Sequence, residues 1–403
     1  MFRRCQMHTN VVSVLLLIAS VFTLVGCEPS VPDQQSESHS TGEDVTMDMP
    51  MDMPLIIGTY TGSVKDTEVD ASQGLYILNF DSNSGEAGQP ELAAPIENPS
   101  FAAIDHDKQR VYVASETEAG QVAAFQWSAD SAELKPINIV SSEGAYPCYL
   151  ALSPDKTRLA VANYGSGNIA VYEIDPVSGA IGDTPQTRQH SGHGPNPQRQ
   201  EAPHAHWVQW SPDGQFIYVV DLGIDQIVGY AVDPESGMLG EGFTAMKTSA
   251  GSGPRHMVFH PHKNLVYIFS ELNNSVVMAN RETDGTLTAR QSLSSLPEGY
   301  SGSSYGAHIA ISPDGKNLYA SNRGHDSIVV FDIAEDGRLE PTQWVSTEGD
   351  WPRFFVLLPK QETLLVANER SHNIVVFHVG ADGHLSPVGQ SVQVAQPVYI
   401  GHL

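Results

Sequence analysis

The feature that most constrains the fold is a unit of about fifty residues that recurs from residue 55 onward. Turns of the Ser-Pro-Asp type, each lying between two short apolar runs, occur at residues 153–155, 211–214 and 312–315. With degenerate copies included, the equivalent positions are His106, Pro154, Pro212, Pro261, Pro313 and Pro359, separated by 48, 58, 49, 52 and 46 residues. A period near fifty made of strand-type segments predicts a propeller and not a solenoid of helices.

Each repeat is predicted to contain four short strands. In one repeat we expect strands over residues 206–210, 216–220 and 227–232, and a weaker outer strand after Gly237. Val, Ile, Tyr and Phe dominate these segments, and Gly, Pro, Asn and Asp separate them. Because no long apolar pattern has a period of 3.6 residues, we expect very little helix.

The two ends of the repeat region complement each other. Six repeats are complete, whereas a seventh begins at residue 55 and supplies segments 55–60 and 74–78 without an innermost strand. Residues 397–400 at the C-terminus can provide that strand, and such pairing would close the ring without an open edge. The sequence therefore predicts an all-β, seven-bladed β-propeller over residues 55–403, closed by its N- and C-terminal strands.

The N-terminal segment has the pattern of an export signal. Arg3 and Arg4 precede an apolar run over residues 11–25, which is short for a membrane span and ends in Gly26-Cys27. Small residues before a cysteine resemble the lipobox of bacterial lipoproteins, and the alternative is an ordinary signal peptide with a chance cysteine. We predict a lipoprotein signal over residues 1–27, lipidation of Cys27, and anchoring to the bacterial cell envelope, on the periplasmic or the cell-surface side.

The segment after the signal is predicted to be a disordered linker. Residues 28–54 are rich in Pro, Ser, Asp, Gln and Glu and offer little to bury. The formal net charge of −26 argues against nucleic acid or an anionic membrane surface as the main partner. We therefore expect contact with the membrane only through the N-terminal lipid anchor. A monomer is the working expectation, although the sequence itself does not specify the oligomeric state. Cys148 would be the one cysteine left in the propeller, so we expect no disulfide.

Polar residues gather at one end of the predicted inner hairpins. The innermost strand of each repeat runs toward the turn and the next strand returns, so residues five or six before the turn position meet those nine or ten after it. These positions hold Cys148, His206, Arg255, Arg353, Tyr149, Trp207, His256, His308, Phe354, Asn322, Glu116, Glu271, Arg323 and Glu369. Buried charges are costly unless they are paired or solvated, so we expect a water-filled pocket on the propeller axis.

Three arginines in this set suggest an anion site in an otherwise acidic protein. Arg255, Arg323 and Arg353 carry guanidinium groups, which bind carboxylate and phosphate in a bidentate manner. The alternative is that such Arg–Glu pairs only link neighbouring blades. An insertion over residues 190–206 enters the polar end and is predicted to form a partial lid. Its histidines at 193, 204 and 206 match no standard zinc spacing, so we predict no metal.

Several motifs resemble a known family. They are Gly58-Thr59-Tyr60-Thr61, Arg199-Gln200 with His204-Ala205-His206, Gly253-Pro254-Arg255-His256 followed by Glu271, and Asn322-Arg323. Over roughly residues 55–402 the chain resembles the lactonase family of seven-bladed propellers, whose activities include 6-phosphogluconolactone hydrolysis and muconate lactonisation. The resemblance implies a catalytic set of His206, Arg255, Glu271 and Arg323. It also implies substrate-binding roles for Arg199, His204, His256, His308, Asn322 and Arg353.

The leading hypothesis is hydrolysis of a small anionic lactone, a sugar-acid or sugar-phosphate lactone, without a metal or another cofactor. Arg255 and Arg323 would hold the anionic group and stabilise the oxyanion that forms when water attacks the ring carbonyl. Either Glu271 or His206 would take the proton from water. Two alternatives remain open: a muconate-type lactonizing cycloisomerase, and a non-catalytic surface propeller that binds a glycan or a protein.

Overall fold

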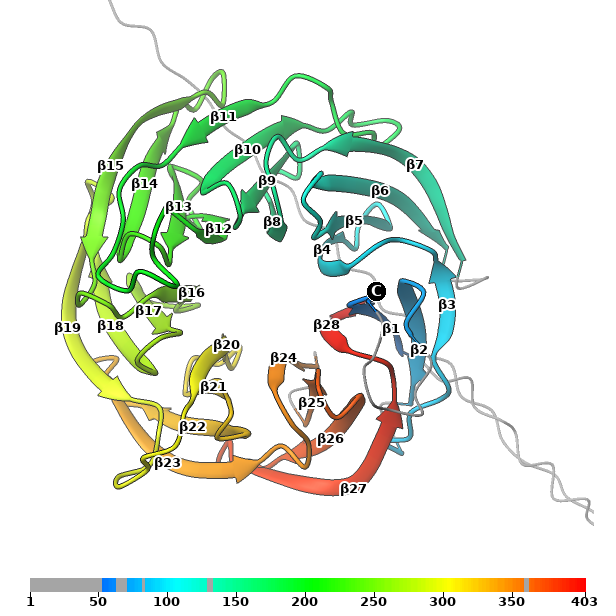
Figure 1. Cartoon of the computed structure of the whole chain (residues 1–403), viewed down its shortest axis with the longest axis vertical. Coiled ribbons are helices and arrows are strands. Elements are labelled where there is room, and N and C mark those ends of the chain that lie inside the picture. The colour runs from blue at the N-terminus through cyan, green and yellow to red at the C-terminus, as the bar shows by residue number, and fades with distance from the viewer. Residues whose placement is uncertain (1–52, 63–70, 82–83, 129–132, 359–361) are drawn as a thin grey trace, which may run out of the picture. The chain divides into compact units, whose positions relative to one another are not determined.

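Seven antiparallel sheets form a ring in the computed structural model, which describes residues 53–62, 71–81, 84–128, 133–358 and 362–403. Each sheet is one blade of four strands, and the described residues contain no helix. Figure 1 shows the blades arranged around a common axis, with β4, β8, β12, β16, β20, β24 and β28 innermost. The predicted seven-bladed propeller is thus confirmed. Cys27 and the predicted signal lie outside the described residues.

The blades follow one another along the chain. Blade 1 contains β4 (Pro99–Asp105), β5 (Arg110–Ser115), β6 (Gln121–Ser128) and β7 (Glu133–Ser141). Blade 2 contains β8 (Pro147–Leu152), β9 (Arg158–Asn163), β10 (Asn168–Glu173) and β11 (Gln186–Gln189). Blade 3 contains β12 (Ala205–Trp210), β13 (Phe216–Asp221), β14 (Gln226–Val232) and β15 (Leu239–Lys247). Blade 4 contains β16 (Pro254–Phe259), β17 (Leu265–Ser270), β18 (Ser275–Arg281) and β19 (Leu287–Ser294).

The remaining blades include the closure. Blade 5 contains β20 (Tyr305–Ile311), β21 (Asn317–Arg323), β22 (Ser327–Ile333) and β23 (Leu339–Ser346). Blade 6 contains β24 (Pro352–Leu357), β25 (Thr363–Asn368), β26 (Asn373–Val379) and β27 (Leu385–Gln393). Blade 7 joins β28 (Pro397–His402) to β1 (Met53–Thr59), β2 (Leu75–Phe80) and β3 (Glu91–Ala94).

Blade 7 closes the ring with both ends of the propeller. Strand β28 pairs antiparallel with β1, so that Ile400 lies opposite Ile57 and His402 opposite Leu55. In Figure 1 the red β28 lies beside the blue β1. This is the pairing predicted from the sequence, and it gives blade 7 the same four-stranded sheet as the other blades. Strand β1 begins at Met53, two residues before the predicted start of the propeller at residue 55.

Every innermost strand contains a β-bulge near its start. The register shifts between Pro254 and His256 in β16, and equivalent shifts occur in the other six innermost strands. Successive side chains of a regular strand point to opposite faces, but a bulge re-aims them. Here Nη1 of Arg255 lies 3.2 Å from Nε2 of the next residue, His256. Two consecutive residues therefore face the axis together.

The second of these two axial residues builds an aromatic layer across the centre of the ring. One ring comes from each blade: Phe101, Tyr149, Trp207, His256, His308, Phe354 and Tyr399. Ring centroids in contact are between 3.9 and 5.9 Å apart. All of the rings except Trp207 form a closed circuit, and Trp207 joins it through Tyr149. Offset and edge-to-face contacts of this kind stabilise buried aromatic rings. A cavity of about 410 Å³, lined in part by His308, Phe354 and Tyr399, lies next to the layer.

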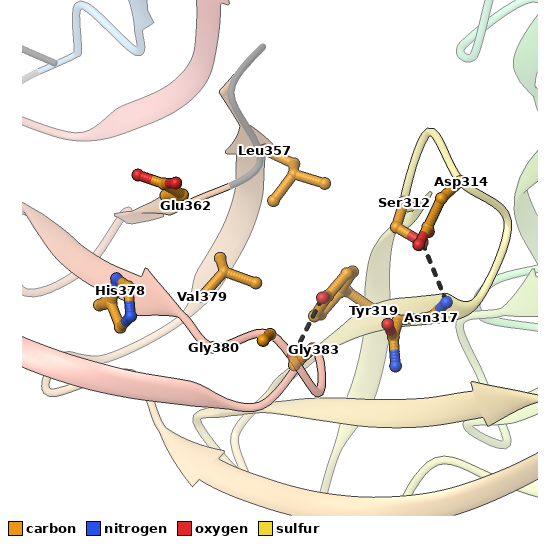
Figure 2. Close-up of a pocket in the computed structure, with 11 residues that line it drawn as sticks. Ser312, Asp314, Asn317, Tyr319, Leu357, Glu362, His378, Val379, Gly380 and Gly383 are labelled. Carbon is orange, nitrogen blue, oxygen red and sulfur yellow. Dashed lines mark hydrogen bonds between the residues drawn. The ribbon is translucent and has the colours of Figure 1, made fainter.

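Tyrosine hydroxyls join several blades on their outer side. The hydroxyl groups of Tyr112, Tyr218, Tyr267 and Tyr319 donate to the carbonyls of Gly179, Gly285, Gly337 and Gly383 in the following blade. Figure 2 shows the bond from Tyr319 to Gly383, 2.9 Å long, in the groove between blades 5 and 6. Gly383 has φ of +79°, and a Cβ there would lie 2.3 Å from the Asn317 side chain. The recurring glycine of the repeat therefore serves both the turn and the blade contact.

Candidate functional site

The Glu271 carboxylate is the centre of the predicted site. Glu271 follows β17, and its Oε2 lies 3.1 Å from Nε of Arg255 and 2.7 Å from Nη2 of Arg323. Its Oε1 accepts a hydrogen bond from Nη2 of Arg199. The structure thus brings together three members of the predicted catalytic set and adds Arg199, which was predicted only as a substrate-binding residue. Three guanidinium groups surround one carboxylate, which leaves these four residues with a net charge of +2.

This cluster is more enclosed than the sequence suggested. The exposed fractions of the side chains are 2% for Arg255, 5% for Glu271 and 6% for Arg323. Arg199, with a 34% exposed side chain, contacts the same carboxylate from the insertion. The prediction of a water-filled well at these residues was therefore wrong in this structure. The charges are stabilised by pairing with each other instead of by solvent.

Bulged backbone in blade 5 holds two of the arginines. Nη1 of Arg255 donates to the Ala307 carbonyl over 2.7 Å, and Nη2 of Arg323 donates to the Gly306 carbonyl over 2.9 Å. The pairing of β20 with β21 is irregular between Gly306 and Ile309, so these carbonyls are available to side chains. Burial, together with the nearby Arg323 and Arg353, lowers the pKa of Arg255 to about 9. Arg255 therefore remains charged at neutral pH.

The two candidate bases have different electrostatic environments. Burial alone would raise the pKa of Glu271, but Arg323, Arg255 and Arg199 outweigh burial and hold that pKa well below its usual range. Burial, and secondly Arg255, lowers the pKa of His206 well below its usual value. At neutral pH the pair therefore consists of an ionised carboxylate and a neutral imidazole. Nδ1 of His206 lies 3.8 Å from Sγ of Cys148.

Two buried aspartates fix the insertion that carries Arg199. Asp221 accepts hydrogen bonds from the His204 amide over 2.8 Å and from Nδ1 of His190 over 2.6 Å. Asp225 accepts from Nε2 of the fully buried Gln200, again over 2.8 Å. These bonds hold both ends of the insertion, so that Arg199 reaches the Glu271 carboxylate. The insertion thus covers the polar end, as the predicted lid would.

The predicted residue His204 lies beside this lid. Its ring stacks on Tyr164 with centroids 4.5 Å apart, and its Nδ1 lies 2.9 Å from the Tyr164 carbonyl oxygen. The hydroxyl group of Tyr164 accepts a hydrogen bond from Nη2 of Arg199 over 3.4 Å. His204 therefore supports the surroundings of Arg199, and it makes no contact with Glu271 among the described bonds.

His256 and His308 form a hydrogen-bonded pair within the aromatic layer. Their Nδ1 atoms are 3.1 Å apart, and Nε2 of His256 faces Nη1 of Arg255 at 3.2 Å. Because arginine can only donate, Nε2 of His256 accepts, and a neutral His256 carries its proton on Nδ1. His308 then accepts at Nδ1. Burial, followed by the charge of Arg255, lowers the pKa of His308 to about 3, in agreement with a neutral ring.

Asn322 was predicted to bind the substrate, but its side chain contacts a neighbouring loop instead. Its side chain is fully buried, its Oδ1 accepts from the Ser295 hydroxyl over 2.5 Å, and its Nδ2 donates to the Ser295 carbonyl over 3.2 Å. Asn163 and Asn368 hold the equivalent position and also donate to a loop carbonyl. The position therefore anchors a loop in several blades, which argues against a substrate contact. The repetition of asparagine in the sequence was the signal for this role.

A second charged group completes the polar end. Nη2 of Arg353 lies 3.5 Å from Oε2 of Glu116, and the Tyr60 hydroxyl donates to the same oxygen over 3.0 Å. The Arg353 guanidinium lies 5.0 Å from the centre of the Tyr60 ring. Sequence reasoning selected Arg353 but assigned no role to Tyr60 or Glu116. The signals were present, because Glu116 holds the repeat position of Glu271 and Tyr60 belongs to the Gly-Thr-Tyr-Thr motif.

The described residues contain neither a metal-binding cluster nor a membrane-spanning helix. Within the described ranges, no group of three or more His, Cys, Asp or Glu side chains is placed to hold a metal ion. Nδ1 of His193 lies 3.2 Å from the neighbouring Gly194 carbonyl oxygen. No helix among the described residues has the length and hydrophobicity needed to cross a membrane.

Comparison with known proteins agrees with the fold and with the motifs. The family model described as "Lactonase, 7-bladed beta-propeller" matches residues 54–401. The 6-phosphogluconolactonase of Bacillus subtilis is 33% identical over 308 residues, which cover 76% of this chain and 85% of that protein.

Solved structures give the same match at the level of the fold. The structure of the periplasmic gluconolactonase of Pseudomonas aeruginosa has a TM-score of 0.80 and 30% identity, covering 87% of this chain and 99% of that chain. A putative 6-phosphogluconolactonase from Bacteroides fragilis has a TM-score of 0.78 and 29% identity, with coverage of 89% and 99%.

Proposed function

This chain belongs to the lactonase family of seven-bladed β-propellers, and we propose on that premise that it hydrolyses the lactone of a sugar acid, with or without a phosphate group. The names of its relatives, a 6-phosphogluconolactonase and a periplasmic gluconolactonase, support lactone hydrolysis. The observation that carries the proposal is the arrangement of three guanidinium groups around Glu271 next to the neutral His206.

In the proposed reaction, water attacks the lactone carbonyl and negative charge develops on its oxygen. Arg255 and Arg323 stabilise this oxyanion, since both are fixed by backbone carbonyls before the substrate arrives. The bond between the carbonyl carbon and the ring oxygen then breaks, and the ring oxygen leaves as a hydroxyl group. The product is the open-chain acid, whose carboxylate the same guanidinium groups can bind.

We propose that His206, and not Glu271, is the group that moves the proton. Both oxygens of the Glu271 carboxylate already face guanidinium groups, whereas the His206 imidazole is neutral at neutral pH and can take a proton from water and pass it to the ring oxygen. We assign Glu271 the role of positioning the guanidinium groups. Because Arg199 covers the cluster and is the most exposed of the three arginines, its displacement is the step that admits the substrate.

A direct test uses a panel of lactones with the purified protein. Acid release from glucono-δ-lactone and 6-phosphoglucono-δ-lactone is followed in a pH-stat, with the uncatalysed rate subtracted and a muconate included to detect cycloisomerisation. Arg255→Ala should lower kcat/KM about 100-fold or more, the usual effect of losing an oxyanion donor. His206→Asn should lower it similarly, and His193→Asn, in the same insertion, should not. An unchanged rate for Arg255→Ala contradicts the proposal, and inhibition by EDTA contradicts its metal-free form.

We also propose that the chain is exported as a lipoprotein anchored through Cys27. The pattern of residues 1–27 supports this, as does the periplasmic relative. Cys27→Ser should release the protein from the membrane fraction, since the acyl chains provide the anchor. Cys5→Ser changes a cysteine of the same leader and should leave fractionation unchanged. Membrane association that survives Cys27→Ser would refute the lipid anchor.

A further inference from the structure

The polar end of the propeller has a second half that the proposed chemistry does not use. Three blades contribute one residue each: Tyr60 follows β1, Glu116 follows β5 and Arg353 lies in β24. The side chains of Arg353 and Glu116 are 14% and 15% exposed, compared with 2% to 6% for Arg255, Glu271 and Arg323. Arg353 and Glu116 are therefore more accessible than the three buried residues that Arg199 covers.

The second half stands close to the catalytic half. The charge of Arg353 contributes to lowering the pKa values of both Arg255 and His206, after the larger effect of burial. Arg353 and Arg255 also hold the same bulged position, in β24 and β16. A lactone with its carbonyl beside His206 and Arg255 would thus extend its remaining ring atoms toward Tyr60, Glu116 and Arg353.

The charge balance of the two halves differs. Around Glu271, three guanidinium groups share one carboxylate. Arg353 instead forms one ion pair, with Glu116, and the negative charge of Glu369 also acts on it. Both contacts of the Glu116 carboxylate use Oε2, and the one to Arg353 is long at 3.5 Å. Over the described residues, Oε1 of Glu116 makes no hydrogen bond. A carboxylate with a spare acceptor, beside a phenol and a guanidinium, can bind neutral hydroxyl groups as donor and as acceptor.

We propose that Tyr60, Glu116 and Arg353 form a subsite for the hydroxyl groups of the substrate, and that Glu116 disfavours a phosphate group there. The preferred substrate is then an unphosphorylated sugar-acid lactone. This inference rests on the proposed lactone hydrolysis and narrows its substrate class. Glu116 repels the phosphate dianion and neutralises Arg353, so this half of the site offers no net positive charge to a phosphate.

A purely structural role would also explain an ion pair between blades 6 and 1. Such a pair would affect the stability of the ring closure but not the choice between two substrates. The two roles can therefore be distinguished by one ratio, that of kcat/KM for glucono-δ-lactone to kcat/KM for 6-phosphoglucono-δ-lactone. This ratio is insensitive to a loss of folded protein, because both rates fall together.

The test compares the wild type with Glu116→Gln and with the control Glu118→Gln, an exposed residue two positions later. We expect the wild type to favour the unphosphorylated lactone about tenfold or more, and Glu116→Gln to reduce that preference by about tenfold. Glu118→Gln should leave it unchanged. Tyr60→Phe removes a hydroxyl donor without a change in charge, so it should weaken hydrolysis of the unphosphorylated lactone without improving that of the phosphorylated one.

Calorimetric titration with the products gives a readout that needs no turnover. Gluconate should bind the wild type more tightly than 6-phosphogluconate, and Glu116→Gln should narrow the difference in Kd. An equal preference in wild type and Glu116→Gln, or a wild type that prefers the phosphorylated lactone, would overturn the subsite. A wild type that hydrolyses neither lactone would instead refute the proposed function, and this assignment with it.

Discussion

Glu271 shows how one buried residue organises the charged cluster. Its carboxylate is the shared partner of Arg199, Arg255 and Arg323. The sequence predicted that Arg255, Glu271 and Arg323 converge, because all three hold repeat positions at the same end of the inner hairpins. It did not predict that Arg199 would seal the cluster, since Arg199 lies in an insertion that no other repeat contains. A side chain outside the repeat has no equivalent position from which to infer its contacts.

Replacing Glu271 should be costly, and the cost should depend on pH. Glu271→Gln keeps the shape but leaves buried guanidinium groups without a counter-charge, so the free energy of unfolding should fall by about 3–5 kcal/mol at pH 7. Because the folded-state pKa of Glu271 lies below the unfolded value of about 4.3, its stabilisation is complete above about pH 5. The stabilisation is then lost as the pH falls toward the folded-state pKa.

Urea unfolding at pH 7, 5 and 3.5 measures this effect. The difference between wild type and Glu271→Gln should be largest at pH 7 and should shrink at pH 3.5. The control is Glu241→Gln, an exposed carboxylate on β15, which should change stability by less than about 0.5 kcal/mol. A Glu271→Gln variant as stable as wild type at pH 7 would show that the cluster does not depend on this carboxylate.

Among the elements, the positions of the strands could be predicted from the sequence, whereas the bulges of the innermost strands could not. Alternating Val, Ile, Tyr and Phe predicted β12, β13 and β14 to within about one residue at each end. The bulges were not predicted, because a bulge arises from pairing with a neighbouring strand and leaves no fixed residue signature. The aromatic layer had a visible signal, since Tyr149, Trp207, His256, His308 and Phe354 are all aromatic at one repeat position. The sequence argument used that position only to predict a polar, wet pocket.

His256 lies in the bulge of β16 and contacts both Arg255 and His308. We therefore predict that His308 fixes the orientation of Arg255 through His256. His308→Asn places an amide oxygen near the position of Nδ1 and keeps an acceptor for His256, whereas His308→Phe keeps the stacking on Phe354 and removes the acceptor. We expect His308→Phe to lower kcat about tenfold or more with little change in KM, because Arg255 loses its fixed orientation. His308→Asn should recover most of the rate.

Steady-state kinetics and thermal unfolding separate this role from a general packing role. If His308 only fills the layer, the phenylalanine variant should be the more active of the two, since a phenyl ring packs better there than an amide. If His308 contacts the substrate, both variants should raise KM. Only a positioning role predicts a loss in kcat for phenylalanine together with rescue by asparagine.

For the whole molecule, ring closure was the most predictable feature. The seventh repeat lacked an inner strand and the C-terminus offered an unassigned one, so the pairing of β28 with β1 followed from counting repeats. Neither strand is adjacent in sequence to the other, and β28 also packs between β24 and β4. The final seven residues should therefore contribute far more to stability than their number suggests, because their loss unpairs one edge of β1 and removes the packing against β24 and β4.

Deletion of residues 397–403 tests this closure. The truncated protein should lose the cooperative unfolding transition of the wild type or show it at a much lower Tm, since Val398 and Ile400 are almost fully buried in the intact ring. A synthetic peptide of residues 397–403, added in excess, should raise the Tm in a concentration-dependent manner, because a segment that binds only the folded state stabilises it by mass action. A scrambled peptide of the same composition should have no effect. If the truncated protein unfolds at the wild-type temperature, blade 7 does not depend on β28, and the ring is held by contacts between neighbouring blades alone.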